Sequence, residues 1–296
     1  MAAAVPELDS RGLRVTDRVI VPGVKRLLTF AIVLGVLWGL WESYKWLWES
    51  TGWTWPFVVD DTTMPHIHDI LNAFREPVTA GGPALIHPLL DAAWFTAKEA
   101  LAGFVLGAIF GFGLAVLLVH SRLLERGLLP YVVASQTVPI LAIAPMVVIW
   151  GGSIGLPVWL RVGLISAFLT FFPVTVNTIR GLDSAEPRAL ELMRSYAAGP
   201  WRTLWKVKFP ASLPFIFAAL KVSATACVVG AIIGELPSSI QDGLGGAILN
   251  FNQYYVLDPS ALWATNIVAA GLGIAFFGVI VLVEKLVVRR APEHVA

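Results

Sequence analysis

Six long apolar runs, separated by polar or proline-containing stretches, set the pattern of this chain. The runs cover residues 27–48, 95–119, 128–150, 157–180, 211–235 and 261–287. About 20 apolar residues in a helix cross the roughly 30 Å of hydrocarbon in a bilayer. Because 57% of the residues are hydrophobic and only 14% are charged, the composition excludes an ordinary soluble protein. We therefore expect an all-α integral membrane protein with six transmembrane helices in a single domain, residues 27–290.

The first run follows a basic segment, residues 1–26, and ends among aromatic residues. Trp38, Trp41 and Trp46 are typical of a helix end that lies in the headgroup region. A cleaved signal peptide is the alternative, but it requires a small-residue cleavage site soon after the apolar stretch. We therefore expect a retained first spanning helix.

The second run carries glycine at every fourth position, at Gly103, Gly107 and Gly111. Residues at this spacing share one face of a helix. A face of small residues lets another membrane helix approach closely.

The 183–210 insert is the one long polar and basic segment between apolar runs. Apolar residues recur in it at helical spacing: Leu190, Met193, Ala197, Trp201, Leu204 and Trp205. Gly199 and Pro200 divide it, which predicts two short amphipathic helices with a bend between them. Such helices are marginal in water by themselves, so they must lie on the membrane surface, on their own bundle or on a second protein.

The distribution of charge predicts the orientation. Most of the 21 lysine and arginine residues fall in residues 1–26, in the 120–127 turn, in the 183–210 insert and after the last run. Basic loops stay in the cytoplasm. We expect both termini to be cytoplasmic, including the 291–296 tail, and the insert to be a cytoplasmic loop between the fourth and fifth helices.

Several kinds of chemistry lack the residues they need. The single cysteine, Cys227, supplies neither a disulfide nor a cysteine metal site. His66 and His68, two positions apart, would point to different faces of a helix, so no metal site is expected. The chain has no P-loop sequence for ATP hydrolysis, and no cluster of titratable residues at one membrane depth suggests an enzyme.

The insert carries the motif that links the chain to a family. Glu191, Leu192 and Met193, then Ala197, then Val207, Phe209 and Pro210 stand at the spacing E-A-A, three residues, G, nine residues, I-x-L-P. This arrangement resembles the EAA loop of the permease subunits of binding-protein-dependent ABC importers, especially the sulfonate, taurine and nitrate branch. Leu and Met replace the two alanines, Ala197 replaces the glycine, and Phe209 replaces the leucine. Ala198 and Gly199, just downstream, are expected to supply the flexible turn instead.

The resemblance implies that the insert is a coupling helix in a groove of a separate ATPase subunit. The expected contact residues are Glu191, Met193, Arg194, Tyr196, Ala197, Gly199, Trp201, Arg202, Trp205 and Pro210. The alternative is that the apolar stripe only packs under the bundle or lies on lipid headgroups.

The resemblance also implies the function and the partners. The chain would form the path for a small organic solute in the inner (plasma) membrane, without enzymatic activity or a bound cofactor of its own. ATP and Mg²⁺ would be used by the partner ATPase. The other expected partners are a second permease copy, with a different permease as the alternative, and an extracytoplasmic solute-binding protein on residues 49–92 and 236–262. No nucleic acid is expected.

Polar residues within the apolar runs are candidates to line the path, since a polar group facing lipid is costly. They are Gln136, Thr137, Asn177, Ser223, Thr225 and Glu235. Hydrogen bonding between helices is the alternative for each serine, threonine and asparagine. Lys221 is expected to reach toward the cytoplasmic surface with its long side chain.

The main rival function is an ATP-independent secondary transporter or channel. Such carriers tend to show internal repeats with interrupted helices in matching positions, and this chain shows neither. The runs contain no cluster of like charges, which favours an uncharged or weakly charged aromatic solute.

Overall fold

The computed structural model describes residues 11–288, except 53–54, 56–57, 79–80 and 239. Throughout these residues the named elements are helices, and a single antiparallel bridge joins Pro77 and Ala84. The all-α prediction is therefore confirmed. The chain divides into two compact units, residues 1–71 and 72–296.

The first unit is built on one long helix, α1 (Arg11–Thr51). The predicted first span lies within α1 without a break, whereas most of the segment expected to be a tail is helical, because α1 already begins at Arg11. Residues 1–10 lie outside the described residues. A short helix, α2 (Ile67–Ala73), follows at the boundary between the two units.

Ionic and polar contacts tie the segment before α2 back to the end of α1. The Glu42 carboxylate lies 2.7 Å from Nδ1 of His66 and accepts a hydrogen bond from the backbone N–H of Ile67 at 3.1 Å. Lys45 forms an ion pair with Asp61, and this ammonium group holds the pKa of Asp61 below its usual range. Charged groups near the end of α1 thus find their partners in the residues that follow it.

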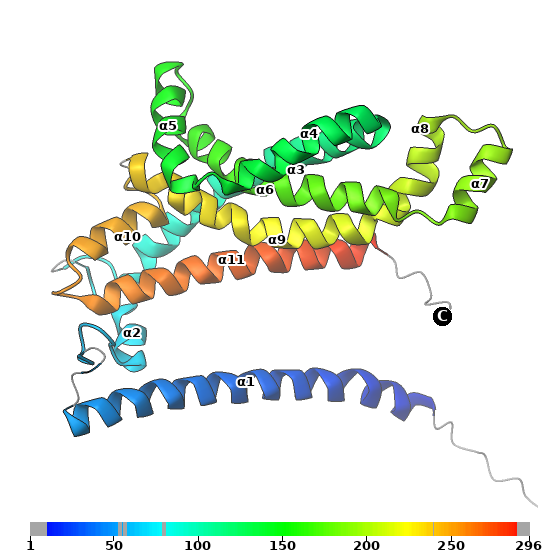
Figure 1. The fold of residues 1–296 in the computed structure, drawn as a ribbon. Helices are drawn as coiled ribbons and strands as arrows, with labels where there is room; N and C mark the ends of the chain where they lie inside the picture. Colours follow the sequence, from blue (N-terminus) through cyan, green and yellow to red (C-terminus); the bar gives the residue numbers. More distant parts are fainter. Residues whose placement is uncertain (1–10, 53–54, 56–57, 79–80, 239, 289–296) are drawn as a thin grey trace, which may run out of the picture. The chain divides into compact units, whose positions relative to one another are not determined.

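Long apolar helices build the second unit (Figure 1). They are α3 (Ile86–His120), α6 (Val158–Asp183), α9 (Phe209–Glu235) and α11 (Pro259–Val287). Four helical segments of the described chain are long and apolar enough to cross a membrane, or five if the bent pair described next is one span. The chain is thus a multi-span membrane protein, and a total of six spans stays a prediction.

The predicted span at 128–150 is divided. Its helices are α4 (Arg122–Ala134), a 3₁₀ turn η1 (Ser135–Thr137) and α5 (Ile140–Ser153), and the two arms meet at 98°. The prediction of one continuous helix is therefore wrong. Pro139 disfavours helical backbone at the residue before it, and Val138 is extended (φ −78°, ψ 122°).

α3 and α6 pack through the glycine face that the sequence predicts. A Cβ atom on Gly107 would lie 2.6 Å from the carbonyl oxygen of Ala167 and 2.6 Å from Cβ of Thr170. The Thr175 hydroxyl donates to the carbonyl of Gly111 at 3.1 Å, which links the two helices across the same face. Here glycine allows backbone-to-backbone contact that any side chain would prevent.

α6 packs on α9 in the same manner, so α6 lies in the centre of the bundle. A Cβ atom on Gly181 would lie 2.8 Å from Cβ of Ser212. The Ser166 hydroxyl donates to the carbonyl of Cys227 at 3.0 Å. By contrast, α11 buries few of its residues and leaves a long apolar surface exposed. A shorter helix before α11, α10 (Leu244–Gln253), follows a 3₁₀ turn, η3 (Leu236–Ser238), and packs on α3, α9 and α11.

Candidate functional site

The insert between α6 and α9 forms a helix–turn–helix that extends from one end of the bundle (Figure 1). α7 (Pro187–Ser195) begins with a proline at its first position, where no N–H is needed. α8 (Pro200–Thr203) begins likewise after Gly199. Two helices separated at Gly199 and Pro200 are what the sequence predicts.

The second of these helices does not end before the next span. α8 passes into a π-helical turn, η2 (Leu204–Lys208), and then directly into α9, so that residues 200–235 form one helical segment of 36 residues. Pro210 has no N–H to donate within the helix, and the widened π turn lies just before it. The loop is thus joined to α9 without an intervening turn.

The turn between α7 and α8 is closed by backbone hydrogen bonds at the C-terminus of α7. The N–H of Ala198 donates to the carbonyl of Met193 at 2.9 Å, and the N–H of Ala197 donates to the carbonyl of Arg194 at 2.9 Å. This is the Schellman pattern, in which the residue after the helix takes left-handed backbone angles and is usually glycine.

Ala197 holds that left-handed position, with φ at 50°. It stands where the EAA motif has its glycine, and it is the one non-glycine residue with positive φ in the described part of the chain. Gly199 has φ at −65°. The expectation that Ala198 and Gly199 replace the motif glycine is therefore wrong, because the bend stays at Ala197.

We predict that Ala197→Gly stabilises the chain. Left-handed backbone costs about 1–2 kcal/mol for a residue with a Cβ atom, and glycine avoids this cost. Glycine also gains freedom in the unfolded chain, so we expect a net stabilisation of about 0.5–1 kcal/mol. Thermal unfolding of the purified chain measures it. Ala198→Gly, one residue later, is the matched control and should not stabilise; equal effects of the two changes would contradict the prediction.

Most of the large side chains of the loop point to solvent rather than into the bundle. Tyr196 is 74% exposed, Trp201 60% and Trp205 44%, whereas Leu204 is 3% exposed. Met193 is half-buried. Leu204 thus attaches the loop to the bundle, and the aromatic residues remain on the outer surface.

The exposed aromatic side chains form a connected row. The Trp201 and Trp205 rings lie edge to face with centroids 5.8 Å apart, and the ring of Trp205 lies 5.0 Å from that of Phe209. At the other end, Trp201 lies 6.2 Å from the ring of His120, the last residue of α3. The row therefore holds Trp201 in place before any partner binds.

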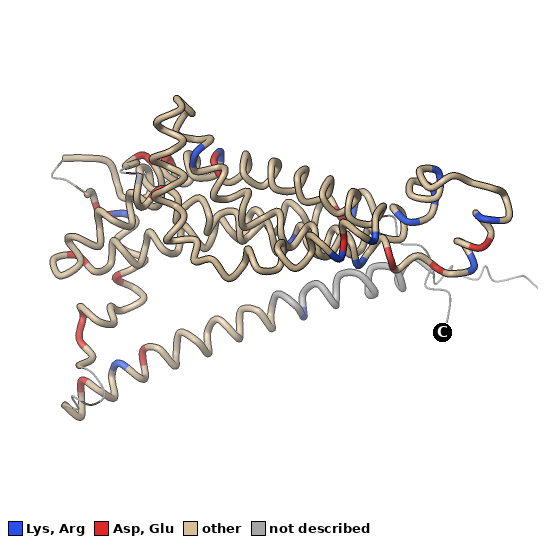
Figure 2. The backbone as a smooth tube through the Cα atoms, turned by 45° about the horizontal axis from the view of Figure 1, so that its top comes forward, with Lys and Arg blue, Asp and Glu red and all other residues tan. Residues whose placement is uncertain are grey.

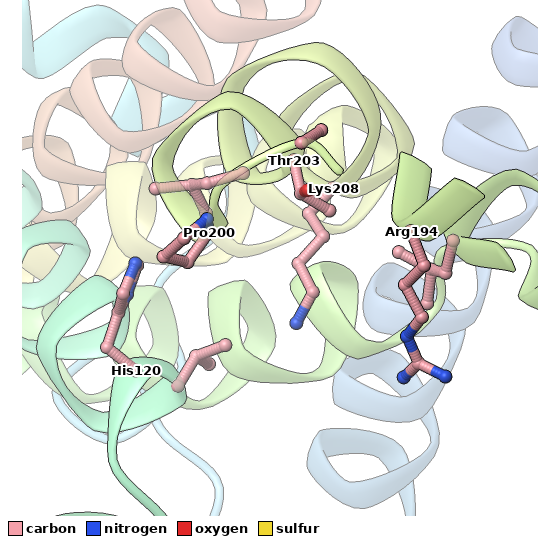
Figure 3. A pocket seen from close by; sticks show the side chains of 9 residues that line it. His120, Arg194, Pro200, Thr203 and Lys208 are labelled. Carbon is pink, nitrogen blue, oxygen red and sulfur yellow. The ribbon is translucent and has the colours of Figure 1, made fainter. Parts of the chain in front are cut away.

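A cavity of about 430 Å³ opens between the end of α3 and the loop (Figure 3). Figure 3 shows Lys208 between His120 on one side and Arg194 on the other. The ammonium group of Lys208 lies 3.9 Å from Asp183, so its charge is partly balanced. Figure 2 shows basic residues gathered at this end of the bundle, whereas the middles of the long helices carry few charges. Exposed aromatic rings beside basic groups suit a partner surface that is partly apolar and partly acidic.

The motif residues with charge are also at the surface. Glu191, Arg194 and Arg202 are all exposed. A polar rim of this kind can fix the orientation of a docked helix while the aromatic residues supply the buried area.

The candidate path residues do not gather on one surface. Ser223 and Glu235 are fully buried inside the bundle, and the Ser223 hydroxyl lies 3.3 Å from the carbonyl of Thr170. Asn177 donates to the carbonyl of Pro173 on its own helix at 2.8 Å. Gln136, Thr137 and Thr225 are exposed. The arrangement of Ser223 fits helix-to-helix hydrogen bonding, and Glu235 does not face an opening.

Two charged contacts differ from expectation. Lys221 was expected to extend toward the cytoplasmic surface. Its ammonium group instead forms an ion pair with Glu284 of α11 at 3.0 Å. His66 precedes α2, so the argument that it and His68 point to different helix faces does not hold. Glu42, His66 and His68 instead bring ligand-type atoms within 4.8 Å of one another.

Glu99 on α3 is a buried carboxyl group that was not predicted from the sequence. A glutamate within a predicted span was the signal available, since intramembrane ionisable residues are rare and generally functional. Its neighbour Lys98 at the edge of the apolar run made both residues look like a charged helix end.

These features define a multi-span membrane transport protein with a surface-exposed amphipathic loop continuous with one of its spans. Residues 103–289 match the family described as binding-protein-dependent transport system inner membrane component. The chain therefore belongs to this family of ABC transporter permeases, as the loop motif predicted.

Relatives agree with this assignment. A probable ABC transporter permease protein of Haemophilus influenzae is 31% identical over 235 residues, which cover 79% of this chain and 86% of the relative. The formylaminopyrimidine transport permease protein ThiX of Halalkalibacterium halodurans is 31% identical over 184 residues, 62% of this chain and 71% of the relative. The fold is similar to that in a crystal structure of an amino acid ABC transporter with histidines, with a TM-score of 0.54, 16% identity, and coverage of 70% of this chain and 95% of that one.

Proposed function

We propose that this permease forms one half of the transport path of an ABC importer, and that the 183–210 loop receives the force of ATP hydrolysis from a separate ATPase subunit. The observation that carries the proposal is the exposed row of Trp201 and Trp205 on a helix that runs unbroken into α9. A rigid helix whose end presents large aromatic residues is suited both to docking and to transmitting movement.

The electrostatic character of the loop supports docking on a protein. Arg194, Arg202 and Lys206 surround the aromatic row and are exposed. Basic residues by themselves would also suit anionic headgroups, which is the alternative for this surface. Family membership favours the ATPase, because permeases of ABC transporters contain no nucleotide site of their own and this sequence has no P-loop.

The remaining parts of the proposal follow from this role. A second copy of the chain would complete the path, a binding protein would deliver the solute on the side opposite the loop, and both termini would be cytoplasmic. The relative ThiX is named for formylaminopyrimidine transport. Together with the few charges in the middles of the long helices, this favours a small, neutral or weakly charged aromatic solute.

Co-purification tests the proposal without knowledge of the solute. The full-length chain, expressed together with ABC-type ATPase subunits of the same organism, should purify with one of them as a stable complex. Its rate of ATP hydrolysis should differ from that of the ATPase alone. The rival is an ATP-independent carrier, and solute uptake by liposomes that contain this chain without any ATPase would establish that rival instead.

A further inference from the structure

Two carboxyl groups are enclosed at the end of the bundle opposite the loop. Glu99 of α3 is 1% exposed, and Glu235, the last residue of α9, is 0% exposed. The Thr96 hydroxyl donates to Glu235, and Thr96 lies three residues before Glu99 on α3, so Glu235 packs against the face of α3 that carries Glu99. Buried carboxylates are costly unless each is paired with a cation or hydrogen-bond donors. The partners of the two groups therefore decide their charge.

Glu235 is well provided with donors. The Thr96 hydroxyl donates to one carboxylate oxygen at 2.7 Å, and the backbone N–H of Gly245 donates to the other at 2.6 Å. Thr96 in turn accepts a hydrogen bond from the N–H of Leu244 at 2.9 Å. These N–H groups belong to the first turn of α10, where the helix dipole also favours a negative charge. Glu235 is thus in surroundings that suit the ionised form.

The chain around Glu235 leaves room only for glycine. A Cβ atom on Gly243 would overlap the Glu235 carboxyl group, and one on Gly245 would lie 2.7 Å from Cβ of Glu235. The segment from Gly243 to Gly245 thus lies directly against this side chain. The contact fixes the start of α10 to both α3 and α9 (Figure 1).

Glu99 differs because neither of its two buried carboxyl oxygens has a hydrogen-bond partner in the part of the chain that the structure describes. Two ionised groups here would repel one another at low dielectric, and Glu99 would carry an unpaired buried charge. A proton on Glu99 removes both costs, since its hydroxyl can then donate to Glu235. This distribution of one proton over two carboxyl groups is the stable one for a close buried pair.

We propose that Glu99 and Glu235 form a proton-binding site in which Glu99 is the protonated partner, and that this pair holds the start of α10 against α3 and α9. Glu99 is the donor and Glu235 is the acceptor that connects it to Thr96 and Gly245. Loss of the proton places two negative charges in the same enclosed space. The contact that positions α10 is then lost as the pH rises.

The other charged groups on the surrounding elements do not replace the proton. Lys98 of α3 is exposed and lies over the ring of Phe95, 5.4 Å from its centre, although its charge also acts on Glu99. Arg161 of α6 donates to the carbonyl of Leu156 at 2.7 Å. Asp91 and Asp242 are exposed and line a cavity that includes neither glutamate, and α10 contains no charged residue.

Infrared spectroscopy of the purified full-length chain tests the proposal directly. At neutral pH the spectrum should contain the carbonyl band of a protonated carboxyl group, and the band should disappear at alkaline pH. Glu99→Gln should remove the band, since the amide replaces the acid while still donating to Glu235. Asp91→Asn, an exposed change on the same helix, is the matched control and should leave the band in place.

A second measurement follows the position of α10. Deuterium uptake of residues 244–253 should increase at alkaline pH in the wild-type chain, but not in Glu99→Gln measured at the same pH. A merely structural role of Glu99 would give no such difference in pH dependence. The proposal is overturned if the wild-type chain lacks the protonated-carboxyl band at neutral pH. This test does not depend on whether Glu99→Gln folds. It is equally overturned if the band survives in a folded Glu99→Gln variant.

Discussion

Replacing Trp201 with alanine is expected to weaken the binding of the ATPase subunit to the permease by about 2 kcal/mol or more, which is roughly a 30-fold loss of affinity. Trp201 is exposed but held between His120 and Trp205, so little freedom is lost when a partner covers it. Large, preorganised aromatic side chains are the residues that dominate the energy of docking. The dissociation constant of the detergent-solubilised complex measures the effect.

Trp94→Ala is the matched control for this prediction. Trp94 is 68% exposed, similar to Trp201, but it lies on α3 far from the loop. Both variants lose one exposed indole, so a general effect on solubility or expression would appear in both. Equal affinity of the Trp201 variant and the wild-type chain would show that the loop surface faces lipid or solvent instead of an ATPase.

Replacing Gly107 with alanine is expected to destabilise the bundle by about 1–3 kcal/mol, the usual cost of forcing extra volume into a tight contact. The added methyl group would lie 2.6 Å from the carbonyl oxygen of Ala167, a backbone atom that cannot rotate away. α3 and α6 would have to separate, which loosens the contact on which the centre of the bundle depends. Thermal unfolding of the purified chain in detergent measures the loss.

Gly113→Ala provides the comparison on the same helix. A Cβ atom on Gly113 would meet nothing within 4 Å, so the substitution adds no clash. Alanine is also the better helix former, by up to about 1 kcal/mol. The two changes should therefore act in opposite directions. A similar loss of stability in both variants would mean that helix propensity or lipid contact, and not the contact with α6, decides the role of Gly107.

The lengths of the apolar runs predicted the major helices well. Inside a membrane the backbone N–H and C=O groups must form their hydrogen bonds within the segment, and a long helix achieves this. The positions of α3, α6, α9 and α11 follow from this rule. The main error, the continuous helix predicted at 128–150, comes from a proline. Pro145, Pro173 and Pro214 lie inside helices, whereas Pro139 begins one after an extended residue. Within an apolar run, tertiary contacts decide which proline ends a helix, and composition gives no indication of it.

The candidate site, too, could be predicted only in part from the sequence. Gly199 and Pro200 mark the start of α8, because this boundary depends on local backbone geometry. The bend was expected at Ala198 and Gly199, but it lies at Ala197, the position of the motif glycine. The pairs of Glu99 with Glu235 and of Lys221 with Glu284 join different helices. Such contacts depend on helix rotation and depth, which a single sequence without internal repeats does not specify.

The continuity of residues 200–235 has a mechanical consequence. α9 by itself has 27 residues and is about 40 Å long at the usual rise per residue, so tilting it by about 5° displaces its far end by roughly 3.5 Å. A small displacement of the end that carries the tryptophans would thus move the other end of α9, beside Glu235 on the opposite side of the membrane, by several ångströms. In the proposed coupling to an ATPase, no relay of side chains between these points would be needed, because α9 itself would serve as the lever.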